Sequence, residues 1–185
     1  MSTCDFPHAV MKATNLLSKV TCAAAVAAAI FGLSSVAVGQ EAAISRQDKE
    51  FLKNAAEMGA AEVQLGKLAS EKATSADVKA LGKKLAEDHS KANTELADLA
   101  KKKNVEIPME PNAAQKRSIS AFEKKSGEEF DKEFREHVAK DHEKAIKSFT
   151  ETAKESKDPD VKAFAEKNIK SLQEHHQSAG GQERR

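Results

Sequence analysis

The chain has 185 residues, with 30 Lys and Arg against 29 Asp and Glu, 4% aromatic residues, and neither Trp nor Tyr. A chain of this length has room for one domain and a leader, and its net charge of +1 excludes the clustered basic excess of a nucleic-acid-binding surface. The 8 Gly, the 4 Pro and the abundance of Ala, Lys, Glu and Leu argue against a β-rich fold.

Residues 1–39 differ in composition from the rest of the chain. Lys12 and Lys19 precede an uncharged stretch at 20–38, and a highly charged segment begins after Gln40. A basic start, an apolar stretch and small residues before a polar boundary are typical of a secretory signal peptide. An uncleaved membrane anchor is the alternative, because the stretch is long enough to span a bilayer.

Cleavage ahead of Gln40 would leave residues 40–185 as a single exported domain with a short disordered C-terminal tail. We expect it in the periplasm or associated with the cell envelope, without a membrane segment once the leader is removed. Met11 is a second candidate start, since it begins a better-formed leader than the first residue does. Cys4 and Cys22 both fall in the leader, so the mature chain has no disulfide and no thiolate ligand.

Start signals and helical periodicity predict two long helices in the first part of this domain. Ser45 and Thr74 are each followed three residues later by Asp, which is typical of a helix start of the capping-box type. Apolar and small residues then recur by threes and fours over 45–73 and over 74–99, as one face of a helix requires.

The second part of the domain begins with a predicted loop at 104–112, which contains two prolines. A short helix is expected at 113–125. A third long helix, at 126–149, opens with Ser-Gly-Glu-Glu, a further capping-box pattern. The fourth opens with Asp-Pro at 158–159, and the glycine pair at 180–181 ends it.

Tight connections near Ser75 and Pro159 predict that the helices on either side of each form an antiparallel hairpin. The fold class is therefore all-α: an antiparallel four-helix bundle of ferritin-like topology, two hairpins joined by a longer crossover with a short extra helix. Six phenylalanines are expected in its core: Phe51, Phe122, Phe130, Phe134, Phe149 and Phe164.

Acidic and imidazole side chains interrupt the apolar stripe of every long helix. The candidate metal ligands are Glu62, His89, His142 and His175, with His176 as the alternative to His175. A supporting polar network is expected from Asp88, Asp141, Glu174 and His176. Adjacent residues lie about 100° apart on a helix, so at most one member of each Asp-His pair points fully inward. The position of the last two histidines near the end of their helix would place them far along the bundle axis.

A buried unpaired carboxylate costs several kcal/mol, so these groups require partners or a metal. A carboxylate and imidazole set suits Fe, Zn or Cu. A ferritin-type di-iron site would need Glu-x-x-His on two helices, and no Glu precedes any of these histidines by three residues. The alternative without metal is a hydrogen-bonded network that fixes the helix register. His137 stands one turn before Asp141, where pairing with that carboxylate is the alternative, but it is expected to be exposed.

The sequence resembles the bacterial domain-of-unknown-function 4142 family over about residues 45–178. The resemblance rests on Glu-Val-Gln-Leu-Gly at 62–66, on Asp88-His89, on Phe130-Asp131 with His142, and on the C-terminal helix with His175. It implies a ferritin-like helical bundle and an exported location, with no established reaction. Members are often labelled outer membrane proteins, but nothing after residue 38 predicts a spanning helix.

Three hypotheses for function follow. The first is a periplasmic binding or stress-associated protein whose buried carboxylate–histidine centre can hold a transition metal. The second is a structural or partner-binding bundle in which the polar centre fixes helix register only. The third is a metal-dependent oxidoreductase, although the chain has no phosphate-binding loop, no HExxH and no nucleophile–base–acid set. The sequence indicates neither a protein partner nor an oligomeric state.

Overall fold

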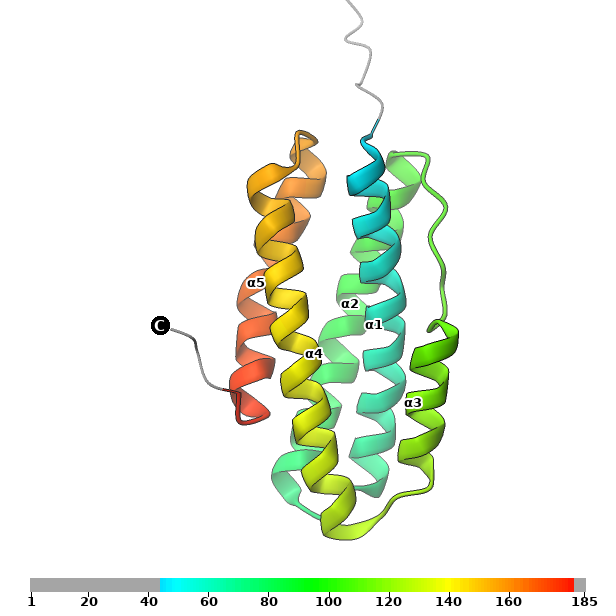
Figure 1. Cartoon of the computed structure of the whole chain (residues 1–185), viewed down its shortest axis with the longest axis vertical. Coiled ribbons are helices and arrows are strands. Elements are labelled where there is room, and N and C mark those ends of the chain that lie inside the picture. Colours follow the sequence, from blue (N-terminus) through cyan, green and yellow to red (C-terminus); the bar gives the residue numbers. More distant parts are fainter. Residues whose placement is uncertain (1–43, 182–185) are drawn as a thin grey trace, which may run out of the picture. The chain divides into compact units, whose positions relative to one another are not determined.

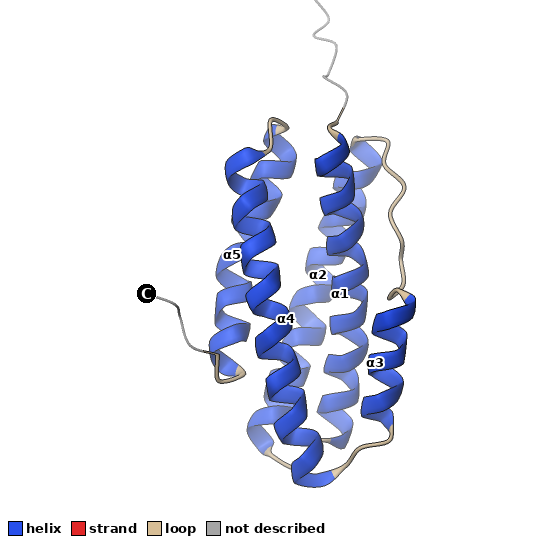
Figure 2. Cartoon of the chain, viewed as in Figure 1, coloured by secondary structure: helices blue, strands red, loops and turns tan. Residues whose placement is uncertain are grey.

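Five helices and no strand make up residues 44–181, the part of the chain that the computed structural model describes (Figures 1 and 2). The helices are α1 (Arg46–Lys72), α2 (Ala76–Lys102), α3 (Ala113–Glu123), α4 (Gly127–Glu155) and α5 (Pro159–Ser178). All described residues belong to one unit, Glu41–Arg185. The predicted leader, 1–39, and the last residues of the predicted tail, 182–185, lie outside the described residues.

The four long helices lie side by side, and the short helix α3 lies beside α1 (Figure 1). α1 packs most extensively against α2, and α4 against α5, each pair being joined by a short turn. Contacts between α2 and α5 and between α1 and α4 join the two pairs. Among the described residues, no helix combines the length and the apolar character that crossing a membrane requires.

Two helix starts follow the predicted capping chemistry. Ser45 is the N-cap of α1, and its Oγ accepts a hydrogen bond from the amide of Asp48 at 3.0 Å. Asp158 is the N-cap of α5, and its carboxylate accepts from the amides of Asp160 and Val161 at 3.0 and 3.1 Å. Each bond satisfies an amide that would otherwise lack a partner in the first helical turn.

Two other predicted starts need correction. With Thr74 as its N-cap, α2 would begin at Ser75. It begins one residue later, at Ala76, and Ser75 is its N-cap. The carboxylate of Asp131, on α4, accepts hydrogen bonds from the amides of Thr74 and Ser75, so a distant side chain caps this helix. Ser126 is the N-cap of α4 as predicted, but its side chain makes no capping hydrogen bond in the described structure.

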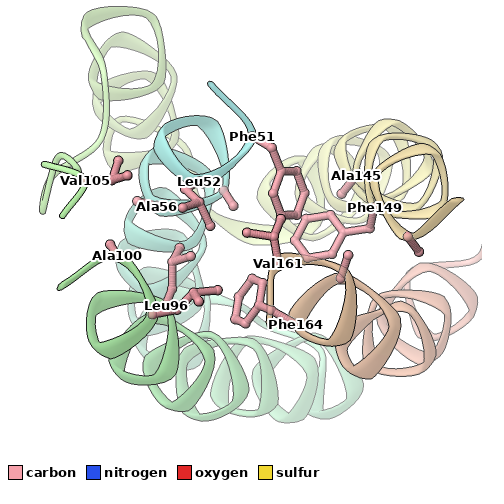
Figure 3. Packing of buried hydrophobic residues seen from close by; sticks show 14 of the residues in the cluster. Phe51, Leu52, Ala56, Leu96, Ala100, Val105, Ala145, Phe149, Val161 and Phe164 are labelled. Atoms are coloured by element: carbon pink, nitrogen blue, oxygen red, sulfur yellow. The ribbon is translucent and has the colours of Figure 1, made fainter. Parts of the chain in front are cut away.

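Two apolar clusters fill the interior. Large members of the first are Phe51, Leu52, Leu96, Phe149, Val161 and Phe164 (Figure 3). Large members of the second are Leu65, Val78, Leu85, Phe130, Phe134 and Val138. All six phenylalanines expected in the core are buried. Four of the buried polar residues, Glu62, His89, His142 and His175, fall where the helices change from one cluster to the other, so they form a polar layer between the clusters.

Two glycines bring the backbones of α1 and α2 together beside this layer. A Cβ on Gly66 would lie 2.5 Å from the carbonyl oxygen of Gly82, and a Cβ on Gly82 would lie 2.7 Å from the carbonyl oxygen of Gly66. No residue larger than glycine fits at either position without moving backbone atoms. The close approach therefore fixes the register between α1, which carries Glu62, and α2, which carries His89.

Gly66→Ala is expected to lower the free energy of unfolding by about 1–3 kcal/mol, although alanine favours helices over glycine by about 1 kcal/mol. Urea denaturation would measure the change. Gly59→Ala is the matched control on the same helix, because its Cβ meets the side chain of Asn93, which can rotate away. An equal cost at both positions would show that backbone contact is not what matters at Gly66.

Candidate metal centre

Three buried histidines from three helices converge in the polar layer. His89 comes from α2, His142 from α4 and His175 from α5, and their exposed fractions are 5%, 1% and 1%. His142 Nε2 lies 3.4 Å from His89 Nε2 and 3.3 Å from His175 Nδ1. The three nitrogens all lie within 4.8 Å of one another.

Hydrogen bonds on the far sides of two rings determine which nitrogens carry protons. His142 Nδ1 lies 3.0 Å from the carbonyl oxygen of Val138, one turn earlier on α4. A carbonyl oxygen only accepts, so Nδ1 must carry the proton and donate it. In the neutral imidazole, His142 Nε2 therefore presents a lone pair to the other two histidines.

The same reasoning applies to His175. Its Nε2 lies 3.0 Å from Asp88 Oδ2, and this oxygen also accepts from Lys84 Nζ at 2.9 Å. Burial raises the pKa of Asp88, but hydrogen bonds from Lys84 and His175 outweigh that effect and hold it below its usual value. Asp88 is thus an ionised acceptor, and His175 Nδ1 presents its lone pair to His142.

Burial also keeps these imidazoles uncharged. It lowers the pKa of His142 from 6.5 to about 3, and that of His89 well below 6.5, with the neighbouring histidines adding to the effect. Burial lowers the pKa of His175 too, against the opposing effect of Asp88. At neutral pH all three are neutral, which is the form of histidine that binds metal ions.

Glu62 lies beside this cluster but outside the convergent set. Its Oε1 is 4.0 Å from His142 Nδ1, the nitrogen turned away from the other two histidines. Its Oε2 is buried and has no hydrogen-bond partner among the described residues. Burial, and secondly the charge of Asp141, raises the pKa of Glu62 from 4.5 to about 8. The carboxyl group is therefore mostly protonated at neutral pH.

The expectation that His175 lies too far along the axis is wrong. α5 has 20 residues against 29 in α4, so its last turn lies beside the middle of α4, where His142 is located. His176 is also buried, but it lies against Gly181 rather than in the cluster. Glu174 is exposed and pairs with Lys84 at 3.8 Å.

The two Asp-His pairs have different partners. Asp88 supports His175, whereas Asp141 faces away from the cluster and pairs with Lys144 at 2.8 Å and His137 at 3.4 Å. In both pairs the histidine is the buried member and the aspartate is partly exposed. His137 is half-buried rather than exposed, because its ring packs against that of Phe122 with centroids 5.3 Å apart.

Fold and site together define an all-helical bundle protein with a buried three-histidine cluster. A family model described as "Domain of unknown function (DUF4142)" matches residues 33–181. The chain belongs to this family, as the resemblance in its sequence indicated. Comparisons with curated proteins and with solved structures give no match.

Proposed function

We propose that this protein is an exported, ferritin-like four-helix bundle that binds one transition-metal ion through His89, His142 and His175. In this proposal residues 1–39 are a cleaved signal peptide, residues 40–185 are the mature domain, and the periplasm is its location. The ferritin-like assignment is supported by two helical hairpins joined by a longer connection.

One observation carries the metal proposal: the lone pairs of His142 Nε2 and His175 Nδ1 face each other across 3.3 Å. Neither nitrogen can donate to the other while Val138 and Asp88 hold the protons on the opposite sides of the rings. Two facing lone pairs repel, and a cation between them converts the repulsion into attraction. Outer hydrogen bonds of this kind are the usual support of metal-binding histidines.

The spacing of the nitrogens suits a small first-row ion. A tetrahedral ion with metal–nitrogen bonds of about 2.0–2.1 Å holds its ligands about 3.3–3.4 Å apart. The distances from His142 Nε2 to His89 Nε2 and to His175 Nδ1, 3.4 and 3.3 Å, match that spacing. Imidazole ligands favour Zn, Cu or Fe. Glu62, whose Oε1 lies 4.0 Å from His142 Nδ1, stays outside this convergent set.

Elemental analysis tests the proposal on the mature chain purified from periplasm without chelators. We expect about one equivalent of Zn, Cu or Fe, lost in the variant His89→Ala/His142→Ala while circular dichroism still reports a helical protein. The matched control is His137→Ala/His176→Ala, which removes two histidines outside the cluster and should keep the metal.

A protein that is metal-free and also fails to bind added Zn²⁺, Cu²⁺ or Fe²⁺ would overturn the proposal. A double variant with a lower melting temperature, in a protein that never held metal, would instead favour a network that fixes helix register. Calorimetric titration of the metal-free protein with each ion distinguishes the two results.

A further inference from the structure

The convergent set of donors consists of imidazole nitrogens and contains no carboxylate oxygen. Of the His, Asp and Glu residues that the structure describes, His89, His142 and His175 alone form such a set. Glu62 approaches His142 from the other side of the ring, with its Oε1 4.0 Å from Nδ1. The centre therefore presents three uncharged donors to an ion and no anionic ligand.

The carboxylate that supports the centre is already compensated by cations. Asp88 Oδ2 accepts from His175 Nε2 at 3.0 Å and from Lys84 Nζ at 2.9 Å, and Lys91 Nζ lies 4.0 Å from Asp88 Oδ1. The ring of His175 separates this carboxylate from the converging nitrogens, since Asp88 is bonded to the far nitrogen. The two ammonium groups therefore offset the attraction that Asp88 would exert on an ion in the centre.

Apolar side chains lie one helical turn from the histidines on each of their three helices. They are Leu85, Val138, Ala145, Leu172 and Ala179, all at most 6% exposed. An ion among these residues has little contact with water, and the free-energy cost of removing an ion from water rises with the square of its charge. The cost for a divalent ion is therefore about four times that for a monovalent ion of equal size.

The number of donors also favours a monovalent ion. Protein-bound Zn²⁺ is almost always four-coordinate, and a site with three protein ligands completes it with water. Such a water needs hydrogen-bond partners of its own, and the five apolar side chains offer none. Cu⁺ has a filled d shell and commonly binds three ligands. A trigonal ion with bonds of about 2.0 Å holds its ligands about 3.5 Å apart, close to the observed 3.4 and 3.3 Å.

We propose that the three-histidine centre is selective for Cu⁺ over divalent ions and binds it through three nitrogens, without a fourth ligand. The inference rests on the proposed metal function and names the ion that the centre takes. Imidazole suits copper and zinc alike, so the type of donor does not distinguish them. The uncharged donors, the compensated carboxylate and the apolar surroundings favour the ion with the single charge.

Competition titration under anaerobic conditions tests this selectivity on the mature chain. Bicinchoninate competes with the protein for Cu⁺ in the presence of ascorbate, and a chromophoric zinc chelator competes for Zn²⁺ in a parallel titration. We expect about one Cu⁺ per chain, bound at least about ten-fold more tightly than Zn²⁺. X-ray absorption of the Cu⁺-loaded protein should show three nitrogen ligands and no fourth ligand.

Lys84→Met tests whether charge causes the selectivity. Removing this ammonium group leaves the charge of Asp88 less compensated, and the added attraction is proportional to the charge of the bound ion. The affinity for Zn²⁺ should therefore rise by about the square of the factor by which the affinity for Cu⁺ rises. Lys83→Met is the matched control: Lys83 lies on the same helix, is 75% exposed and pairs with Glu87 at 3.9 Å, so both affinities should stay at the wild-type values.

A smaller preference for Cu⁺, or tighter binding of Zn²⁺, would overturn the inference and leave the three-histidine centre standing. A fourth ligand on the bound Cu⁺ would have the same consequence, and so would equal changes of the two affinities in Lys84→Met. A wild-type protein that binds neither ion would overturn the proposed metal function together with the inference.

Discussion

Lys103→Met is expected to lower the free energy of unfolding by about 3–5 kcal/mol, the largest effect of any single substitution considered for this protein. The side chain of Lys103 is 5% exposed, and its Nζ lies 2.7 Å from both Asp158 and Asp160. These contacts connect the end of α2 to the first turn of α5. Methionine fills the space but leaves the 9%-exposed carboxylate of Asp158 without its cation.

Lys102→Met is the control for this prediction. Its Nζ also contacts Asp160, at 2.8 Å, but the side chain is 56% exposed. Exposed ion pairs contribute about 0–1 kcal/mol, so this variant should unfold at nearly the same urea concentration as the wild type. Equal losses at the two lysines would show that burial does not determine the strength of the pair.

The second large effect is on pH dependence: the metal-free protein is expected to be most stable near about pH 6.5. Burial, followed by the charge of Asp141, raises the pKa of Glu62 from 4.5 to about 8. Between these values the folded protein keeps a proton that the unfolded chain releases. Stability therefore falls as pH rises through this window, by about 2 kcal/mol between pH 6.5 and 8.

The three histidines cause the expected loss of stability at pH values below the maximum. Burial lowers the pKa of His89, His142 and His175 below 6.5, so under acid conditions the unfolded chain binds protons that the folded protein does not. Three such groups outweigh the opposing effect of Glu62. Stability should thus fall as the pH decreases below about 6.5.

Urea denaturation of chelator-treated protein from pH 5 to pH 9 measures both limbs of the profile: the acidic limb below about pH 6.5 and the decline above it. Glu62→Gln should remove the decline above about pH 6.5 and leave the acidic limb in place. Glu87→Gln, on the exposed face of α2, should retain both limbs. A wild-type profile that rises towards pH 8 would contradict the raised pKa of Glu62.

The helices could be predicted from the sequence because their signals are local. The apolar stripes and the caps at Ser45 and Asp158 depend on residues within one or two turns, and the structure has helices at those positions. The predicted start of α2 differs from the observed one because Asp131, whose carboxylate caps this helix, lies on α4 and far away in sequence. No local pattern contains that contact.

Part of the candidate site could also be predicted from the sequence. Breaks in the apolar stripes identified His89, His142 and His175, since a polar residue at a buried position is visible in the periodicity. The position of each residue along the bundle axis could not be predicted, because it depends on the lengths of the other helices. The orientation of Glu62 towards His142 Nδ1 and of Asp141 away from the cluster depends on side-chain rotamers, which periodicity does not report.

The three-histidine cluster is divided between the two hairpins. α2 contributes His89 from the first hairpin, while α4 and α5 contribute His142 and His175 from the second. Neither hairpin alone contains three converging nitrogens, so the cluster exists only while the hairpins are docked. By mass action, any ligand of the cluster adds its binding free energy to that docking equilibrium. The cluster thereby couples ligand concentration to the assembly of the fold itself.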